Sequence, residues 1–147
     1  MGLVIRDARS ADLERLEELE RRCFSVPWTR EQLESQLPDQ QHVFLAAELD
    51  GEVVGYVGMM TVLDEGYISN VAAAPGHRRQ GIGRALIEEL MRRAEARDLS
   101  FVTLEVREHN EPAKRLYEGF GFKPVGLRKN YYDSPKENAI LMTCFLK

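Results

Sequence analysis

The sequence lacks several features that would assign it to particular classes of protein. It has only two cysteines, with no Cys-x-x-Cys or Cys/His cluster, so we expect neither a metal site nor a disulfide framework. Its most apolar segment, residues 53–63, is shorter than the about 20 residues of a membrane-spanning helix. The opening residues, MGLVIRDARS, contain no apolar run typical of a signal peptide. These absences predict a cytoplasmic protein with no metal and no membrane association.

An excess of positive charge is also absent. The formal net charge is −4, whereas general nucleic-acid binders depend on a basic face, so we expect no direct nucleic-acid binding. Apolar residues make up 44% and charged residues 30% of the chain, which is typical of a globular protein. A length of 147 residues favours one core, and residues 1–147 are therefore expected to form a single domain. The oligomeric state stays open.

The first half of the chain has the pattern of an antiparallel sheet. Residues 3–6 predict a strand, and Ser10 is suited to cap a helix with apolar residues at helical spacing. Thr29 and Gln32 fit a capping box at the start of a second short helix, to about residue 37. Asp50-Gly51 predicts a hairpin between strands 43–49 and 52–63, and a third strand follows at 67–73.

The second half changes pattern. It predicts a helix at 82–97, a strand at 101–106, a helix at 110–119, and strands at 122–128 and 138–146. Strands 67–73 and 101–106 should run parallel, because a helix connects them. The expected fold class is therefore α/β, or α+β with a mixed sheet. The sheet is mostly antiparallel, with a central parallel β-α-β unit and flanking helices.

A glycine-rich turn precedes the long helix, in the segment HRRQGIGRALIEELMRRAE at 77–95. Unpaired backbone N–H groups at a helix start, together with Arg78, Arg79 and Arg84, suit a phosphate group. No Gly-Lys-Ser/Thr follows, and the third glycine of a dinucleotide-binding motif is missing. Taken alone, the turn fits equally well a phosphate site or a tight turn with solvated arginines.

The surrounding motifs resemble a known family. RRQGIG at 78–83, preceded by NVAAAP at 70–75, resembles the acetyl-CoA-binding motif of the GCN5-related N-acetyltransferases, the GNAT superfamily. LEVREHN at 104–110 and RLYEGFGF at 115–122 are also similar to that superfamily. The smaller set VPW (26–28), LEVR (104–107), LYE (116–118), NYY (130–132) and AILM (139–142) resembles the RimI type, the ribosomal-protein-alanine N-acetyltransferases. The likeness runs from about residue 4 to residue 146.

This resemblance implies acetyl-CoA as the acetyl donor. The diphosphate would rest on the backbone of residues 79–84, and the pantetheine arm would run along residues 71–73, where two parallel strands splay apart. Ala73-Ala74 departs from the larger Val-Asp more usual in the family, which should matter little if main-chain groups bind the cofactor. The residues implied to bind the cofactor are Val71, Ala72, Ala73, Arg79, Gln80, Gly81, Ile82, Gly83, Arg84 and Asn110.

The resemblance also implies two catalytic residues. Glu105 would be the general base, working through water, and Tyr117 the general acid that protonates the departing thiolate. Strand alternation places Glu105 on the same face as Phe101 and Thr103, where burial would raise its pKa. Without the family match, Glu105 reads as a solvent-facing strand residue and Tyr117 as a packing aromatic. Likewise, Asn110 reads as a helix cap, and the family match adds a contact with the pantetheine arm. Tyr131 and Tyr132 match the family's tyrosine pair near the acceptor groove, or are aromatics on a sheet face.

The chemistry favours a protein N-terminus as acceptor. An α-amine has a pKa of about 7.8 and a lysine amine of about 10.4, so one carboxylate base suits the α-amine better. Asp64 and Glu65 would attract a cationic peptide start, or be simple turn residues. The hypothesis is a cytoplasmic enzyme that acetylates the N-terminal alanine of a small-subunit ribosomal protein.

Other acceptors and other classes of function stay open. Within the same family, the acceptor would be another protein N-terminus, a lysine or a small-molecule amine. A non-catalytic acetyl-CoA-binding module is an alternative of another class, against which the presence of both Glu105 and Tyr117 argues. A nucleotide-binding protein is a third interpretation. It predicts that ATP or NAD competes with coenzyme A in a thermal-shift assay, and we expect neither to compete.

Overall fold

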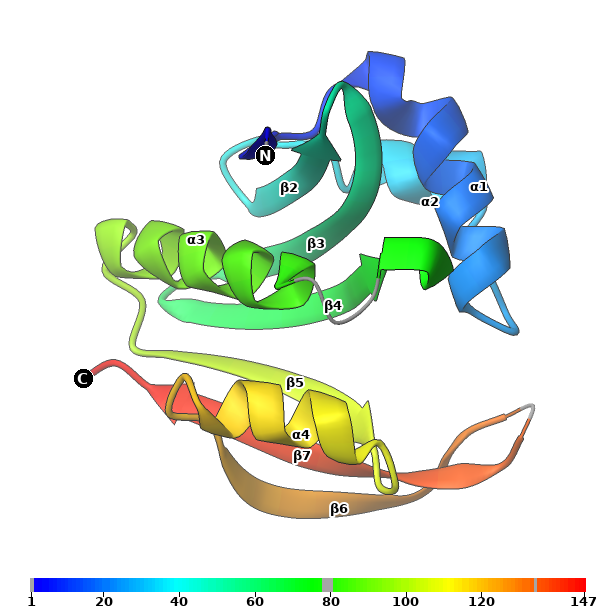
Figure 1. The fold of residues 1–147 in the computed structure, drawn as a ribbon. Coiled ribbons are helices and arrows are strands. Elements are labelled where there is room, and N and C mark those ends of the chain that lie inside the picture. Colours follow the sequence, from blue (N-terminus) through cyan, green and yellow to red (C-terminus); the bar gives the residue numbers. More distant parts are fainter. Residues whose placement is uncertain (1, 78–80, 134) are drawn as a thin grey trace.

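The computed structural model describes residues 2–77, 81–133 and 135–147. Its seven strands form one sheet in the order β1-β2-β3-β4-β5-β7-β6 (Figure 1). The strands are β1 (Leu3–Asp7), β2 (His42–Leu49), β3 (Glu52–Val62), β4 (Glu65–Ala73), β5 (Phe101–Arg107), β6 (Lys123–Tyr132) and β7 (Glu137–Phe145). The helices are α1 (Leu13–Cys23), α2 (Arg30–Ser35), α3 (Ile82–Ala96) and α4 (Glu111–Glu118), with 3-10 turns η1 (Ser10–Asp12) and η2 (Pro75–His77). This mixed sheet with flanking helices confirms the predicted fold class.

Most of the predicted local signals are confirmed. Asp50 and Gly51 take positive φ angles of 52° and 87° at the β2–β3 hairpin. In the capping box, the Gln32 N–H donates to Thr29 Oγ1 at 3.2 Å, and the Thr29 N–H donates to Gln32 Oε1 at 2.8 Å. The expected cap at Ser10 is wrong, because Ser10 begins the 3-10 turn that precedes α1. The carboxylate that closes this turn belongs to Asp12, which accepts the Arg9 N–H at 2.8 Å.

Strand β3 is covered by helices on both faces of the sheet. A Cβ atom on Gly55 would lie 2.9 Å from Ile82 Cγ2 of α3, so this face packs closely under that helix. The next residue, Tyr56, is fully buried and donates its hydroxyl hydrogen to Glu20 of α1. Since successive strand residues point to opposite faces, α3 and α1 lie on opposite sides of β3. The main core therefore surrounds β3 and its neighbours.

The parallel pair of strands separates after a short contact. β4 and β5 pair only at Glu65↔Phe101, Gly66↔Val102 and Tyr67↔Thr103, whereas β5 pairs with β7 along its whole length. The expected pairing of 67–73 with 101–106 was therefore correct in direction and too long. At residues 68–72, the edge of β4 that faces β5 has no strand partner in the described part of the chain. Figure 1 shows the two strands diverging toward their carboxyl ends.

Neither a metal-binding cluster nor a membrane-spanning helix is found among the described residues. They contain no group of three or more His, Cys, Asp or Glu side chains placed to hold a metal ion. None of the helices resolved in the described ranges is long and apolar enough to cross a membrane. Both cysteines, Cys23 and Cys144, are free thiols.

Candidate active site

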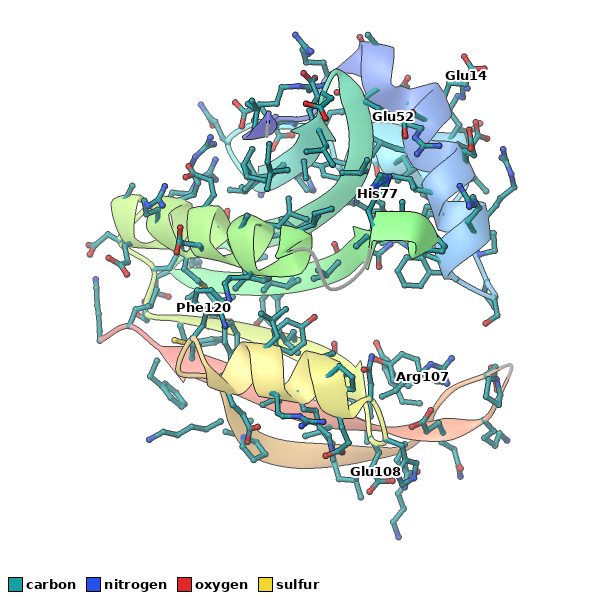
Figure 2. The ribbon with its side chains drawn as sticks, viewed as in Figure 1. Glu14, Glu52, His77, Arg107, Glu108 and Phe120 are labelled. Carbon is teal, nitrogen blue, oxygen red and sulfur yellow. The ribbon has the colours of Figure 1, made fainter. Side chains whose placement is uncertain are left out.

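A cleft of about 1290 Å³ opens where β4 and β5 separate. Every predicted site residue that the structure describes lines it, namely Val71, Ala72, Ala73, Gly81, Ile82, Gly83, Arg84, Glu105, Asn110 and Tyr117. The predicted residues Arg79 and Gln80 lie outside the described residues. In Figure 2, the labelled His77 lies on the β4 side of this opening and Arg107 on the β5 side, and both line the cleft.

The cleft offers a long cofactor two kinds of backbone contact. Along β4, the edge at residues 68–72 has no strand partner among the described residues, so it presents main-chain groups that an extended amide-containing arm can bind as a neighbouring strand would. At the start of α3, Gly81 takes a left-handed conformation (φ 79°, ψ 10°), and the first N–H groups of the helix have no intrahelical acceptor. A Cβ atom on Gly81 would meet no atom of the described residues within 4 Å. These residues fit the pantetheine arm and the diphosphate of acetyl-CoA.

Substitution of Gly81 tests this phosphate position. Gly81→Ala places a side chain at a positive φ, which costs about 1–2 kcal/mol and points a methyl group into the space before the helix. We expect the dissociation constant for acetyl-CoA to rise about tenfold, measured by isothermal titration calorimetry. Gly76→Ala is the matched control, because its Cβ also meets nothing within 4 Å in the described ranges and its φ is not positive. Equal affinities in the two variants would contradict the assignment.

Glu105 projects from β5 into the cleft. Its neighbours Leu104 and Val106 are buried in the core, so alternation turns Glu105 to the other face of the strand. The carboxylate is half-buried, with 26% of the side chain exposed, and its Oε2 lies 3.2 Å from Nε of Arg128 on β6. Burial is thus smaller than the sequence suggested. The carboxylate is instead held by a cation and stays open to the cavity.

Tyr117 reaches the same cleft from α4. Its ring is buried and packs against Phe122 with centroids 5.9 Å apart. Burial raises the pKa of Tyr117 to about 12. Among the described residues its hydroxyl has no hydrogen-bond partner, so the group is a protonated donor without an assigned acceptor. Helix α4 is positioned by its cap, since Asn110 Oδ1 accepts the Ala113 N–H at 3.3 Å, as predicted.

A smaller pocket of about 390 Å³ adjoins the cleft, and the two cavities share lining residues, among them Asn70 and Glu105. Its walls come from the α1–α2 loop, the middle of β4, Glu105 and the end of β6. The lining residues are Trp28, Tyr67, Ile68, Ser69, Asn70, Glu105, Tyr131 and Tyr132. The tyrosine pair on β6 packs edge to face, with centroids 5.0 Å apart. The structure thus places Tyr131 and Tyr132 in this pocket.

Arg107 holds the wall formed by the β6–β7 connection. Its guanidinium lies 4.4 Å from the centroid of the Tyr132 ring. It also donates to the carbonyl oxygens of Pro135 at 2.9 Å and Asp133 at 3.2 Å, and pairs with Glu137 at 3.2 Å. A single side chain at the end of β5 therefore ties both strands of this hairpin to the site (Figure 2).

Two acidic residues expected near the cleft lie elsewhere. Asp64 and Glu65 sit at the β3–β4 turn, where they accept hydrogen bonds from Ser100 Oγ and the Tyr67 hydroxyl, both at 2.5 Å. Neither residue lines the cleft or the pocket. The reason is the direction of the strand. β4 begins at this turn, whereas the cavities lie toward its carboxyl end.

Two polar residues near the pocket, Glu20 and Asn70, were not predicted as site residues from the sequence. Glu20 of α1 is fully buried behind the pocket, and Asn70 of β4 lines it. A signal for Glu20 was present, because it follows Leu13 by seven positions and Leu16 by four, on the apolar side of the helix. A charged residue on such a stripe needs buried partners, and this requirement marks it as unusual.

Comparisons with known proteins agree with this geometry. Residues 13–122 match the Acetyltransferase (GNAT) family. The chain is 34% identical over 146 residues to the [ribosomal protein bS18]-alanine N-acetyltransferase of Haemophilus influenzae, covering 97% of this chain and 99% of that protein. The crystal structure of the ribosomal-protein-S18-alanine N-acetyltransferase from Escherichia coli superposes with a TM-score of 0.92 and 31% identity, covering 99% of this chain and 95% of that one.

A further solved structure was determined with the cofactor. Arabidopsis thaliana NAA60 in complex with acetyl-CoA superposes with a TM-score of 0.88 at 25% identity, covering 99% of this chain and 100% of that one. The family match covers more than half of the chain, and the predicted cofactor residues within the described ranges lie along one cleft. The chain therefore belongs to the GNAT family of acetyltransferases, with acetyl-CoA as its acetyl donor.

Proposed function

We propose that this enzyme acetylates the N-terminal α-amine of a protein, and that its substrate is a small-subunit ribosomal protein that begins with alanine. Residues 1–147 would act as a single acetyltransferase domain in the cytoplasm, where its free Cys23 and Cys144 suit a reducing environment. We assign the smaller pocket to the acceptor and call it the acceptor pocket. The observation that carries the proposal is the position of Glu105, which lines both the cofactor cleft and this pocket.

In the proposed mechanism, Glu105 and Tyr117 handle the two protons of the transfer. The neutral amine attacks the acetyl carbon, so that a C–N bond forms as the C–S bond breaks. Glu105 takes a proton from the nitrogen, directly or through one water, and Tyr117 gives its hydroxyl proton to the departing sulfur. The two groups line the same cleft from different elements, β5 and α4, which supports separate roles as base and acid.

The base available at this site suits an α-amine. At a pH of about 7.4, roughly a third of an α-amine with a pKa near 7.8 is already neutral, whereas a lysine amine is about one part in a thousand neutral. Deprotonation therefore costs about 4 kcal/mol for lysine and under about 1 kcal/mol for an N-terminus. One half-buried carboxylate beside an arginine is matched to the easier amine. The assignment of alanine as the first residue of the substrate is based on the names of the bacterial relatives, which are alanine N-acetyltransferases of a ribosomal protein.

A peptide panel tests the proposed function. Acetyl-CoA turnover, followed by thiol release, is measured on peptides that differ only in their first residue, and on a lysine peptide with a blocked N-terminus. We expect kcat/KM to be highest for alanine, and at least about tenfold lower for the blocked lysine peptide. Turnover confined to the lysine peptide would overturn the proposal and leave the fold and cofactor intact.

A further inference from the structure

A buried carboxylate lies directly behind the acceptor pocket. Glu20 of α1 is 0% exposed and accepts three hydrogen bonds, two from strands and one from the α1–α2 loop. The donors are the Tyr56 hydroxyl on β3, the Trp28 backbone N–H at 2.7 Å, and Nδ2 of Asn70 on β4 at 2.8 Å. Burial raises the pKa of Glu20, and the bonds from Trp28 and Asn70 oppose that shift. A buried carboxylate without hydrogen-bond donors would destabilise the folded state, so Glu20 needs these three donors.

This arrangement determines which way the Asn70 amide points. A carboxylate accepts hydrogen bonds and donates none, so the –NH₂ group of Asn70 must face Glu20. The carboxylate itself is oriented by the Trp28 N–H, a main-chain donor that cannot rotate away. The amide oxygen of Asn70 then points away from Glu20 and is available as an acceptor. It accepts no hydrogen bond from any described residue, and it is not sealed in the protein interior.

Asn70 stands where the two cavities meet. It lines the acceptor pocket and the cofactor cleft, as Glu105 does from the opposite strand. The attacking amine must lie at this junction, since it has to reach both the acetyl group and the base. A neutral primary amine has two N–H groups and one lone pair. With the lone pair aimed at the acetyl carbon and one N–H at Glu105, the second N–H needs an acceptor.

We propose that Asn70 Oδ1 accepts this second N–H of the acceptor amine, and that Glu20 is a positioning residue that holds the Asn70 amide in the required orientation. The inference deepens the proposed function and rests on it. It assigns Asn70 to recognition of the attacking nitrogen and Glu20 to a role carried only through Asn70. It also explains why a carboxylate is buried at this point of α1, where an apolar residue would complete the stripe.

Substitution of either residue then has a defined effect. Asn70→Ala removes the acceptor of the amine N–H, and we expect kcat/KM for the preferred peptide to fall about tenfold or more. In Glu20→Gln the new amide can donate to Asn70, which lets the Asn70 amide turn over and point its –NH₂ at the amine. The expected loss in kcat/KM is again about tenfold. The dissociation constant for acetyl-CoA should stay within about twofold in both variants, because the expected contacts of β4 with the cofactor are main-chain groups that both substitutions keep, and neither residue lies at the phosphate turn.

The decisive measurement is the double variant, Glu20→Gln with Asn70→Ala. If Glu20 acts through Asn70, the double variant loses no more kcat/KM than Asn70→Ala alone. Tyr56→Phe is the matched control, since it removes a donor to the same carboxylate without touching Asn70. It should lower the melting temperature and keep kcat/KM. Asn70→Ala lies on a cavity wall and carries the test even where Glu20→Gln folds poorly.

The outcomes separate this inference from the proposed function. Unchanged kcat/KM in Asn70→Ala, with the wild-type enzyme active on N-terminal peptides, overturns the inference and leaves the proposed function standing. Losses that multiply in the double variant overturn the role of Glu20 through Asn70. A wild-type enzyme that acetylates only lysine overturns the proposed function. The same variants assayed on that amine then decide the role of Asn70. A wild-type enzyme that acetylates no amine overturns both.

Discussion

Glu105→Gln is expected to lower kcat/KM for the preferred peptide by about two to three orders of magnitude, because the amide cannot take the proton that the attacking nitrogen must lose. The change keeps the size of the side chain and retains an oxygen near Arg128. Binding of acetyl-CoA should be nearly unchanged, since the expected contacts with the cofactor are to β4, the start of α3 and Asn110, and do not include Glu105. Steady-state kinetics with thiol detection, together with calorimetric binding of acetyl-CoA, provide the measurement.

The matched control for this variant is Glu88→Gln. Glu88 is an exposed glutamate on α3 that pairs with Arg92 at 3.1 Å, and it lines neither cavity. Exposed ion pairs contribute only about 0–1 kcal/mol, so both stability and turnover should stay close to those of the wild type. If Glu105→Gln retained more than about a tenth of the wild-type kcat/KM, Glu105 would not be the base.

Tyr117→Phe is expected to lower kcat by about two orders of magnitude, the ordinary contribution of a general acid. The reference thiol pKa of about 8.5 makes the leaving group only mildly basic, which keeps the expected loss at this level. The phenylalanine ring can keep the contact with Phe122, so acetyl-CoA affinity and the fold should survive. Single-turnover kinetics separate the chemical step from product release. A variant with wild-type kcat would reduce Tyr117 to a packing residue.

The raised pKa of Tyr117 adds a pH dependence to this test. With a folded pKa of about 12 against an ordinary value of 10.0, the phenol stays protonated across the usual assay range. The folded state holds this proton more tightly than the unfolded state, so the associated stability is complete below a pH of about 10 and is lost as the pH rises toward about 12. Denaturation midpoints measured across this window should fall more steeply for the wild type than for Tyr117→Phe. Parallel curves would contradict the assignment.

Local signals in the sequence predicted most elements of the fold. The Asp50-Gly51 hairpin, the Thr29–Gln32 capping box and the Asn110 cap depend on neighbours within three residues, so spacing alone reveals them. The predicted helix cap at Ser10 was wrong, although it too depended on near neighbours. Ser10 is the first residue of the 3-10 turn, and the carboxylate that accepts the N–H at the start of this turn belongs to Asp12.

The residues of the cleft were predicted from the sequence, whereas their contacts with other elements were not. Motif resemblance named the residues that line the cleft, but it did not show that Glu105 also lines the acceptor pocket or that Arg128 pairs with it. Arg128 lies on β6, which reaches β5 only across β7. Asp64 and Glu65 were misjudged because sequence distance along β4 does not reveal which end of the strand the cavities occupy.

The order of strands and helices, the glycine turn before α3 and the acetyltransferase motifs can all be read from the amino-acid sequence. These features are local, because hydrogen bonds between near neighbours and side-chain periodicity produce them. Three other features appear only in the folded chain: β4 and β5 part after Tyr67, the proposed acceptor pocket meets the cofactor cleft at Asn70 and Glu105, and Glu20 is buried behind them. Such features depend on strand register and on contacts between residues such as Glu20 and Asn70, 50 positions apart in the chain, for which no local pattern exists.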